Sequence, residues 1–204
     1  MSVITISREF GSGGRELGKR LADELGFAYF DKEIVTMIAQ SSELDENYVE
    51  SMLEKHSWNI PITYGTSFSH ITYSHGYSPQ TAIISEQQKI IKQLASSGNC
   101  IIVGRNADVI LEELNPLRLF VYADMDSKLA RCRQRAKEGE NLTDAQMKRY
   151  IKKIDRDRAR NHLLLSDIPW GDRRGYDLMI NTTGANIKAM VSAVAEYAKA
   201  HFGI

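Results

Sequence analysis

The sequence is poor in cysteine and proline and has no long apolar run. Its 204 residues include two cysteines, Cys100 and Cys132, and four prolines. Cys100 opens an apolar run and Cys132 lies in a basic segment, which argues against a disulfide framework or a thiolate metal site. No run reaches the roughly eighteen apolar residues of a membrane-spanning helix. The N-terminus lacks the basic region and cleavage site of a signal peptide, so we expect a cytoplasmic protein with no membrane partner.

The net charge of the chain is zero, but the charges are unevenly distributed along it. Residues 128–174 hold fourteen Lys and Arg against seven Asp and Glu, whereas residues 1–127 hold ten against seventeen. A locally basic segment in a neutral protein indicates a small anionic ligand bound at one place. Non-specific nucleic-acid binding needs a broader positive field, so we expect no nucleic-acid partner.

Short apolar runs alternate with segments of helical periodicity along the chain. This alternation predicts a single α/β domain over residues 1–204, with a parallel sheet of about five strands covered by helices on both faces. We expect strands at 3–7, 28–30, 100–103, 117–122 and 178–181. We expect helices at 15–25, 33–40, 45–55, 81–97, 109–114, 128–137, 144–162 and 186–201. Residues 41–79 differ in composition and indicate a lobe over a site or an interaction surface.

A glycine-rich stretch, SREFGSGGRE at residues 7–16, joins the first expected strand to the first helix. Glycines here let backbone N–H groups approach an anion, and the helix N-terminus adds about half an elementary charge. The stretch departs from Gly-x4-Gly-Lys-Ser/Thr, because Gly14 takes the place of the lysine. It also departs from Gly-x-Gly-x-x-Gly, because residue 16 is Glu, which disfavours a dinucleotide-binding domain. A tight turn without a ligand is the simpler alternative.

Arginines cluster in the basic segment. Arg149, Arg156 and Arg160 recur at spacings of seven and four on one expected helix, and Arg131 and Arg135 are four apart on the preceding one. Arginine offers a planar fork of donors that suits phosphate oxygens. Two basic helices over residues 128–162 therefore predict a lid over a phosphorylated ligand, although solvated helices with internal ion pairs would share the pattern.

The opening stretch at residues 4–16 resembles the signature of the cytidylate kinase-like proteins, relatives of the cytidylate kinases in the P-loop kinase superfamily. The resemblance continues at Phe30-Asp31-Lys32, at Val103-Gly104-Arg105-Asn106, at residues 119–123 with the arginines after them, and at Asp155-Arg156-Asp157-Arg158. These matches cover about three quarters of the chain in the family's order, with a gap at 41–79. The family carries its acceptor-binding lobe in that gap.

The resemblance implies an ATP-dependent kinase acting on a nucleoside monophosphate, with CMP or dCMP as the acceptor, small-molecule nucleotides as partners and Mg²⁺ bridging the donor phosphates. It assigns catalytic roles to Arg15, Arg131 and Arg135. It assigns the donor nucleotide to Arg8, Gly11, Ser12, Gly13, Gly14, Arg15, Glu16, Arg131 and Arg133. It assigns the acceptor to Asp31, Arg105, Arg156, Asp157 and Arg158. No residue is assigned as a metal ligand, and Asp31 is also a candidate N-cap of the helix that follows it.

Several alternatives remain open at this stage. A kinase for another small acceptor, such as a sugar acid or a cofactor precursor, fits the altered segment at 41–79. A nucleotide-binding regulator without catalysis fits the missing lysine. The aromatic residues between Trp58 and Tyr77 fit base stacking, a small satellite core or a homodimer contact equally well, and the spacing of His56, His70 and His75 matches no zinc pattern.

Overall fold

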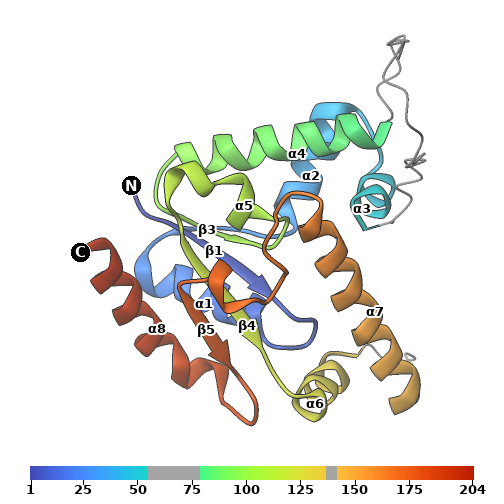
Figure 1. Ribbon diagram of the computed structural model, residues 1–204, viewed down its shortest axis with the longest axis vertical. Coiled ribbons are helices and arrows are strands. Elements are labelled where there is room, and N and C mark those ends of the chain that lie inside the picture. Colours follow the sequence, from blue (N-terminus) through green and yellow to red (C-terminus); the bar gives the residue numbers. More distant parts are fainter. Residues whose placement is uncertain (55–78, 137–141) are drawn as a thin grey trace, which may run out of the picture.

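The computed structural model describes residues 1–54, 79–136 and 142–204. Its centre is a sheet of five parallel strands in the order β2-β3-β1-β4-β5 (Figure 1). The strands are β1 (Val3–Arg8), β2 (Ala28–Phe30), β3 (Cys100–Val103), β4 (Leu117–Tyr122) and β5 (Leu178–Asn181). The central strand β1 pairs with β3 through Ile4 and Ile101 and with β4 through Ile6 and Leu119. Its position brings the loop after β1 to the middle of the sheet's carboxyl edge.

Continuous apolar runs explain why these strands lie inside the molecule. Every residue of β3 is buried, and β1 and β4 are buried along most of their length. A parallel sheet with helices on both faces buries both sides of each strand, so its strands are apolar throughout instead of alternating.

Helices α1 (Gly14–Leu25) and α8 (Ile187–Phe202) cover one face of the sheet. Leu17 and Leu21 of α1, four residues apart, are fully buried in this layer together with Ile4 and Ile6 of β1. Gly26 ends α1 in a left-handed conformation with φ 67°, which glycine adopts without steric cost.

The opposite face is covered by α2 (Glu33–Ser42), α4 (Pro79–Ser96) and the short α5 (Ala107–Ile110), with α3 (Glu46–Glu54) packed on α2 and α4. Ile34 and Ile38 of α2 meet Ile83 and Ile91 of α4 in this second apolar cluster. A 3₁₀ turn, η1 (Glu112–Leu114), follows α5.

Helices α6 (Met125–Arg135) and α7 (Asp144–Leu163) lie beyond the layers, near the end of β1, and both termini lie at the far end of the molecule (Figure 1). Thr143 and Gln146 form a reciprocal capping box at the start of α7, which fixes where this helix begins. A second 3₁₀ turn, η2 (Arg173–Gly175), precedes β5. No helix in the described parts of the chain combines the length and hydropathy needed to cross a bilayer.

The α/β class, the five parallel strands and the positions of the helices are confirmed. Two local predictions differ. The helix expected over 109–114 is divided into α5 and η1 at Leu111. The N-cap of α2 is Lys32, and the Asp31 side chain pairs with arginines instead of capping the helix. The aromatic residues from Trp58 to Tyr77 and the three histidines lie outside the described residues.

Candidate active site

A cavity of about 640 Å³ opens at the carboxyl edge of the sheet. Its wall is built from the ends of β1, β2 and β3 and from helices α3, α4 and α7. Ligands of open α/β sheets bind in this position, because the loops that leave the strands diverge there. The charged wall of the cavity comprises Arg8, Arg15, Asp31, Lys32, Glu50, Arg105, Lys153, Asp157 and Arg158.

Two of the arginines converge on one carboxylate. Arg8 Nη2 lies 3.3 Å from Asp31 Oδ1, and Arg15 Nε pairs with Asp31 Oδ2. Burial, followed by the repulsion of Arg158, lowers the pKa of Arg8 to about 9, against the opposing attraction of Asp31. The cavity therefore holds more positive charge than its own carboxylates neutralise, and an anionic ligand would relieve this repulsion.

The end of β3 shapes the floor of the cavity through three consecutive residues with positive φ. Gly104, Arg105 and Asn106 have φ values of 77°, 59° and 54°. Left-handed backbone is uncommon for arginine and is held here by tertiary contacts, such as the 3.1 Å bond from Asn106 Nδ2 to the Asn161 carbonyl. Gln87 Nε2 donates to the carbonyl of Arg105 from the other side, at 3.4 Å. The strained turn keeps Arg105 at the cavity wall.

Apolar side chains also line the cavity. They are Met52, Leu53, Ile84, Ile154, Leu164, Leu165 and Trp170, and Tyr150 adds an aromatic ring. A cavity lined by both cationic and apolar side chains suits a ligand that carries an anionic group on a less polar body.

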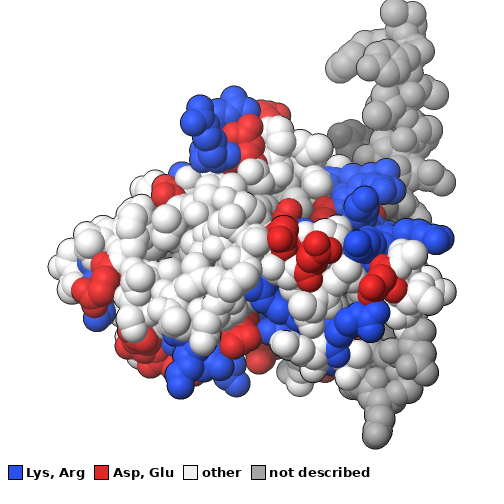
Figure 2. Space-filling model, turned by 90° about the horizontal axis from the view of Figure 1, so that it is seen from below, with Lys and Arg blue, Asp and Glu red and all other residues white. Residues whose placement is uncertain are grey.

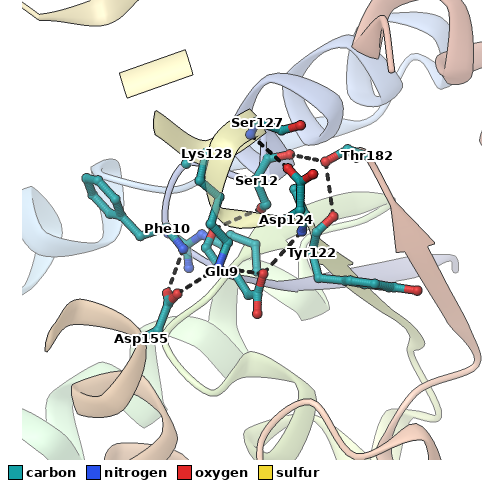
Figure 3. A network of polar contacts seen from close by, with 12 residues as sticks. Glu9, Phe10, Ser12, Tyr122, Asp124, Ser127, Lys128, Asp155 and Thr182 are labelled. Atoms are coloured by element: carbon teal, nitrogen blue, oxygen red, sulfur yellow. Dashed lines mark hydrogen bonds and ion pairs between the residues drawn. The ribbon is translucent and has the colours of Figure 1, made fainter. Parts of the chain in front are cut away.

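The glycine-rich loop lies beside this cavity and is held by hydrogen bonds within the loop and to neighbouring elements. Ser12 is fully buried, and its hydroxyl donates to the Glu9 carbonyl at 2.8 Å. The Ser12 carbonyl accepts a 2.6 Å bond from the hydroxyl of Thr182. The Phe10 N–H donates to Asp155 of α7, also at 2.6 Å, and Lys128 of α6 bridges Asp155 and Glu9 (Figure 3). Both basic helices therefore contact the loop directly.

The glycines of the loop allow this close packing. A Cβ on Gly13, which has φ 87°, would lie 2.8 Å from Ile187 Cδ1, and one on Gly14 would lie 2.6 Å from Arg8 Cβ. Gly11, with φ 76°, lies against the backbone of Lys128. A larger residue at these positions would move the loop away from α6, α8 or Arg8.

The three arginines of α6 bind groups of the protein itself. Arg131 donates to the carbonyl of Thr182 and, at 3.5 Å, to that of Gly11. Arg133 pairs with Asp144, and Arg135 lies 2.8 Å from Glu16 Oε2. Figure 2 shows basic and acidic side chains mixed over the end of the molecule that carries α6 and α7. The excess of positive charge in this segment is thus partly neutralised by acidic partners on the surface.

Comparison with known proteins connects this geometry to a family. The sequence profile of the Cytidylate kinase-like family matches residues 3–184. The chain belongs to this family. No curated protein matches the sequence.

Several solved structures share the fold of this cytidylate kinase-like protein over nearly the whole length of the chain. An uncharacterized protein from Eubacterium ventriosum is 23% identical, with a TM-score of 0.69, 98% of this chain covered and 99% of the other. The shikimate kinase from Bacteroides thetaiotaomicron is 11% identical at a TM-score of 0.58, with 100% and 99% covered. The shikimate kinase from Acinetobacter baumannii in complex with shikimate is 12% identical at 0.56, with 98% and 94% covered. At these identities the likeness shows the P-loop kinase-like fold alone.

The structure groups the residues expected from the family resemblance in three places. The cavity is lined by Arg8, Arg15, Asp31, Arg105, Asp157 and Arg158. The loop beside it contains Gly11, Ser12, Gly13 and Gly14. Arg131 contacts the loop at Gly11, Arg135 pairs with Glu16 of α1, and Arg133 pairs with Asp144 of α7. Arg156 is exposed on α7 and does not line the cavity. Arg8 and Arg15, assigned to the donor from the sequence, thus share one cavity with the residues assigned to the acceptor.

Three residues at or near the site could not be recognised as functional candidates from the sequence. Trp170 lies on the loop after α7, where no periodicity marks it. Gln87 is a buried polar residue within the amphipathic α4, and only its 6% exposure distinguishes it from an ordinary surface glutamine. Lys128 was one of many basic residues in its segment, yet its side chain is only 6% exposed. A buried lysine is the rarer feature, because lysine is almost never buried unless it is paired.

Kinases in general use Mg²⁺ to bridge the phosphates of ATP. Within the described ranges, no three His, Cys, Asp or Glu side chains are grouped so that they would hold a metal ion. Protein-bound Mg²⁺ usually has one or two carboxylates and the substrate's phosphate oxygens as ligands. Glu9 and Asp155, the carboxylates that contact the loop, are already paired with the Lys128 ammonium, so a bound Mg²⁺ would take its ligands mainly from phosphate oxygens and water.

Proposed function

We propose that this cytidylate kinase-like protein transfers the γ-phosphoryl group of ATP to a nucleoside monophosphate, with CMP or dCMP as the preferred acceptor. The observation that supports this best is the grouping of Arg8, Arg15, Arg105 and Arg158 at one cavity beside the glycine-rich loop. Phosphoryl transfer needs positioning and charge stabilisation over several oxygens, and little covalent chemistry from the protein. Four guanidinium groups supply that stabilisation at fixed positions.

The roles follow from where these side chains lie. Arg8 and Arg15, which share Asp31, are at the boundary between loop and cavity and would contact the phosphoryl group in transfer. Arg105 and Arg158 would hold the acceptor phosphate, and Trp170 with the apolar side chains of the lining would contact the base. Mg²⁺, when bound, neutralises charge between the β- and γ-phosphates. A cytoplasmic location stays a prediction.

The test is release of ADP from ATP–Mg²⁺ in a coupled assay, with each nucleoside monophosphate offered in turn. Turnover of about 1 s⁻¹ or faster, the range typical of kinases, with CMP or dCMP preferred, is the expected result. The absence of ADP release with every nucleoside monophosphate would contradict the proposal.

A second candidate is phosphorylation of another small acceptor. The fold is shared with two shikimate kinases, one of them solved in complex with shikimate. A cationic cavity that carries Asp31 and Asn161 at its wall would also suit a hydroxylated carboxylic acid, whose carboxylate would meet an arginine. Adding shikimate and sugar acids to the acceptor series separates the two. Nucleotide binding without turnover on any acceptor would favour a regulator.

A further inference from the structure

The loop has no space for a lysine of its own. At Gly14, where the usual phosphate-loop lysine would be, a Cβ would lie 2.6 Å from Arg8 Cβ and 3.2 Å from Val121 Cβ. Both of these Cβ atoms are bonded directly to the backbone, so they cannot move aside as the end of a flexible side chain can. The Arg8 guanidinium, in turn, is directed toward Gly104 and Asp31. The Arg15 side chain also pairs with Asp31, so a cation beside the middle of the loop comes from another element.

Lys128 of α6 lies in that place (Figure 3). Its Nζ is 2.7 Å from Glu9 Oε2 and 3.1 Å from Asp155 Oδ2, and its side chain is 6% exposed. The loop packs directly on this residue, since a Cβ on Gly11 would lie 3.0 Å from the Lys128 carbonyl oxygen and 3.2 Å from its Cβ. Glu9 is itself fixed by the Ala123 N–H at 3.1 Å, which keeps the ammonium beside the loop.

The carboxylate of Asp155, on α7, binds a backbone N–H of the same loop, as a bound anion would. Its Oδ1 accepts the Phe10 N–H at 2.6 Å, although the two residues are 145 positions apart in the sequence. Backbone N–H groups of glycine-rich loops are the donors that bind phosphate oxygens in nucleotide-binding folds. Asp155 thus makes with Phe10 and Lys128 the two contacts that a donor phosphate would make.

The charges around this carboxylate are not balanced by Lys128 alone. Glu9 and Asp155 share one ammonium, and the remaining cation that faces Asp155 is Arg158, with Nη1 at 3.9 Å. Burial raises the pKa of Asp155, against the opposing effect of the Phe10 N–H and Lys128. The contact between α7 and the loop is therefore one that a better-paired anion would replace.

Building on the proposed function, we propose that Lys128 is the phosphate-binding cation of this loop and that Asp155 holds it until nucleotide arrives. Donor phosphates take the Phe10 N–H and the Lys128 ammonium from Asp155. Glu9 keeps Lys128 in place, so the same ammonium serves both states. The Asp155 contact between α7 and the loop then opens, which links donor binding to the position of the helix that lines the acceptor cavity.

The experiment is calorimetric titration of the full-length protein with adenosine, AMP, ADP and ATP in the presence of Mg²⁺. The variants are Lys128→Met, Lys128→Arg and Asp155→Asn. The matched controls are Lys199→Met, whose lysine pairs with Glu196 near the C-terminal end of α8, and Asp126→Asn, whose carboxylate is exposed on α6. Melting temperatures of all variants show whether each is folded.

We expect Lys128→Met to lose affinity with each added phosphate, by about tenfold or more for ATP and negligibly for adenosine, since charge-assisted bonds to phosphate are lost. Lys128→Arg restores part of this loss. Asp155→Asn binds ATP several-fold more tightly, because the competing anion is gone. The controls bind as the unaltered protein does.

Two results would overturn the inference while leaving the proposed function intact. One is ATP binding by Lys128→Met equal to that of the unaltered protein, or weakened equally for adenosine, as a purely structural lysine would give. The other is weaker ATP binding by Asp155→Asn, which also remains informative if Lys128→Met does not fold. Failure of the unaltered protein to bind ATP would instead contradict the proposed function itself.

Discussion

The guanidinium of Arg8 lies directly over Gly104, at the point where β3 ends. A Cβ at residue 104 would be 1.7 Å from Arg8 Nη1. The ends of β1 and β3 therefore pack together through the side chain of Arg8 and the missing side chain of Gly104. This contact places Arg8 between the loop and the cavity.

Replacement of Gly104 by Ala is expected to impair catalysis more than stability. The added Cβ displaces the flexible end of Arg8, which breaks its pairing with Asp31. We expect kcat/KM to fall by at least about tenfold. The positive φ of 77° disfavours alanine in the folded state and lowers the free energy of unfolding by about 1 kcal/mol.

Gly26→Ala is the matched control for this change. Gly26 has φ 67°, and nothing lies within 4 Å of its missing Cβ. We expect the same loss of stability, about 1 kcal/mol in denaturant unfolding, with unchanged kinetics. Equal kinetics for the two variants would contradict a role for the Arg8–Gly104 contact.

Arg15→Ala is expected to reduce turnover by about a thousandfold while the fold stays intact. Arginines that stabilise the transferring phosphoryl group contribute on this scale. The Arg15 side chain is 52% exposed, so loss of its pairing with Asp31 costs at most about 1 kcal/mol of stability. Steady-state kinetics and melting temperatures check both parts.

Arg20→Ala supplies the comparison on the same helix. Arg20 pairs with Glu16 on the surface of α1, at 3.0 Å, and lies outside the cavity. We expect its kinetics to match those of the unaltered protein. An unchanged rate for Arg15→Ala would remove Arg15 from the mechanism.

Restoring the conventional loop lysine is expected to harm this protein. Gly→Ala in a helix normally stabilises by about 1 kcal/mol. At Gly14 the Cβ would meet Arg8 Cβ and Val121 Cβ, so we expect Gly14→Ala to destabilise by about 1–3 kcal/mol and Gly14→Lys to be worse, without a gain in rate. Denaturant unfolding of both variants measures this.

Gly18→Ala, one turn further along α1, is the control for helix propensity. Its Cβ would lie 3.0 Å from Ile6 Cδ1, the end of a side chain that can adjust. We expect a smaller effect than at Gly14. A Gly14→Lys variant that is as stable as the unaltered protein, or more active, would contradict the packing described for the loop.

The pH dependence of stability should reveal Asp155. Burial raises the pKa of Asp155 above 3.8 in the folded state, so between pH 3.8 and that higher value the folded protein binds more protons than the unfolded chain. The contribution of Asp155 to stability therefore falls as pH rises through this window. Melting temperatures of Asp155→Asn relative to the unaltered protein should rise from about pH 4 toward neutrality.

Asp172→Asn should show the opposite trend. Hydrogen bonds from Arg174 lower the pKa of Asp172 to about 2. Its contribution to stability is present above pH 3.8 and is lost as pH falls toward 2, so this variant should be the less stable one near neutrality. The same trend for both variants would contradict the environment described for Asp155.

Local pattern predicted the elements well because each element depends on its own residues. The spacing of Leu17 and Leu21 marked α1, and the β-branched run from Val3 marked β1. The strand-loop-helix order and the motif at Gly104-Arg105 also placed Arg15, Asp31 and Arg105 at the carboxyl edge of the sheet, where they lie. The division at Leu111 was missed because a 3₁₀ turn and a helix share the same apolar spacing over so few residues.

The sequence by itself determined the five parallel strands, the glycine-rich loop after the first of them and the lack of a lysine in that loop. The tertiary structure decided which charges meet. Arg8 and Arg15 share Asp31, and Arg131 binds carbonyl groups near the loop. Lys128 pairs with Glu9 across 119 positions of sequence, and Asp155 accepts from Phe10 across 145. Such pairings depend on how α6 and α7 pack against the end of β1, because hydrophobic periodicity fixes the buried face of a helix but not the partners of its polar side chains.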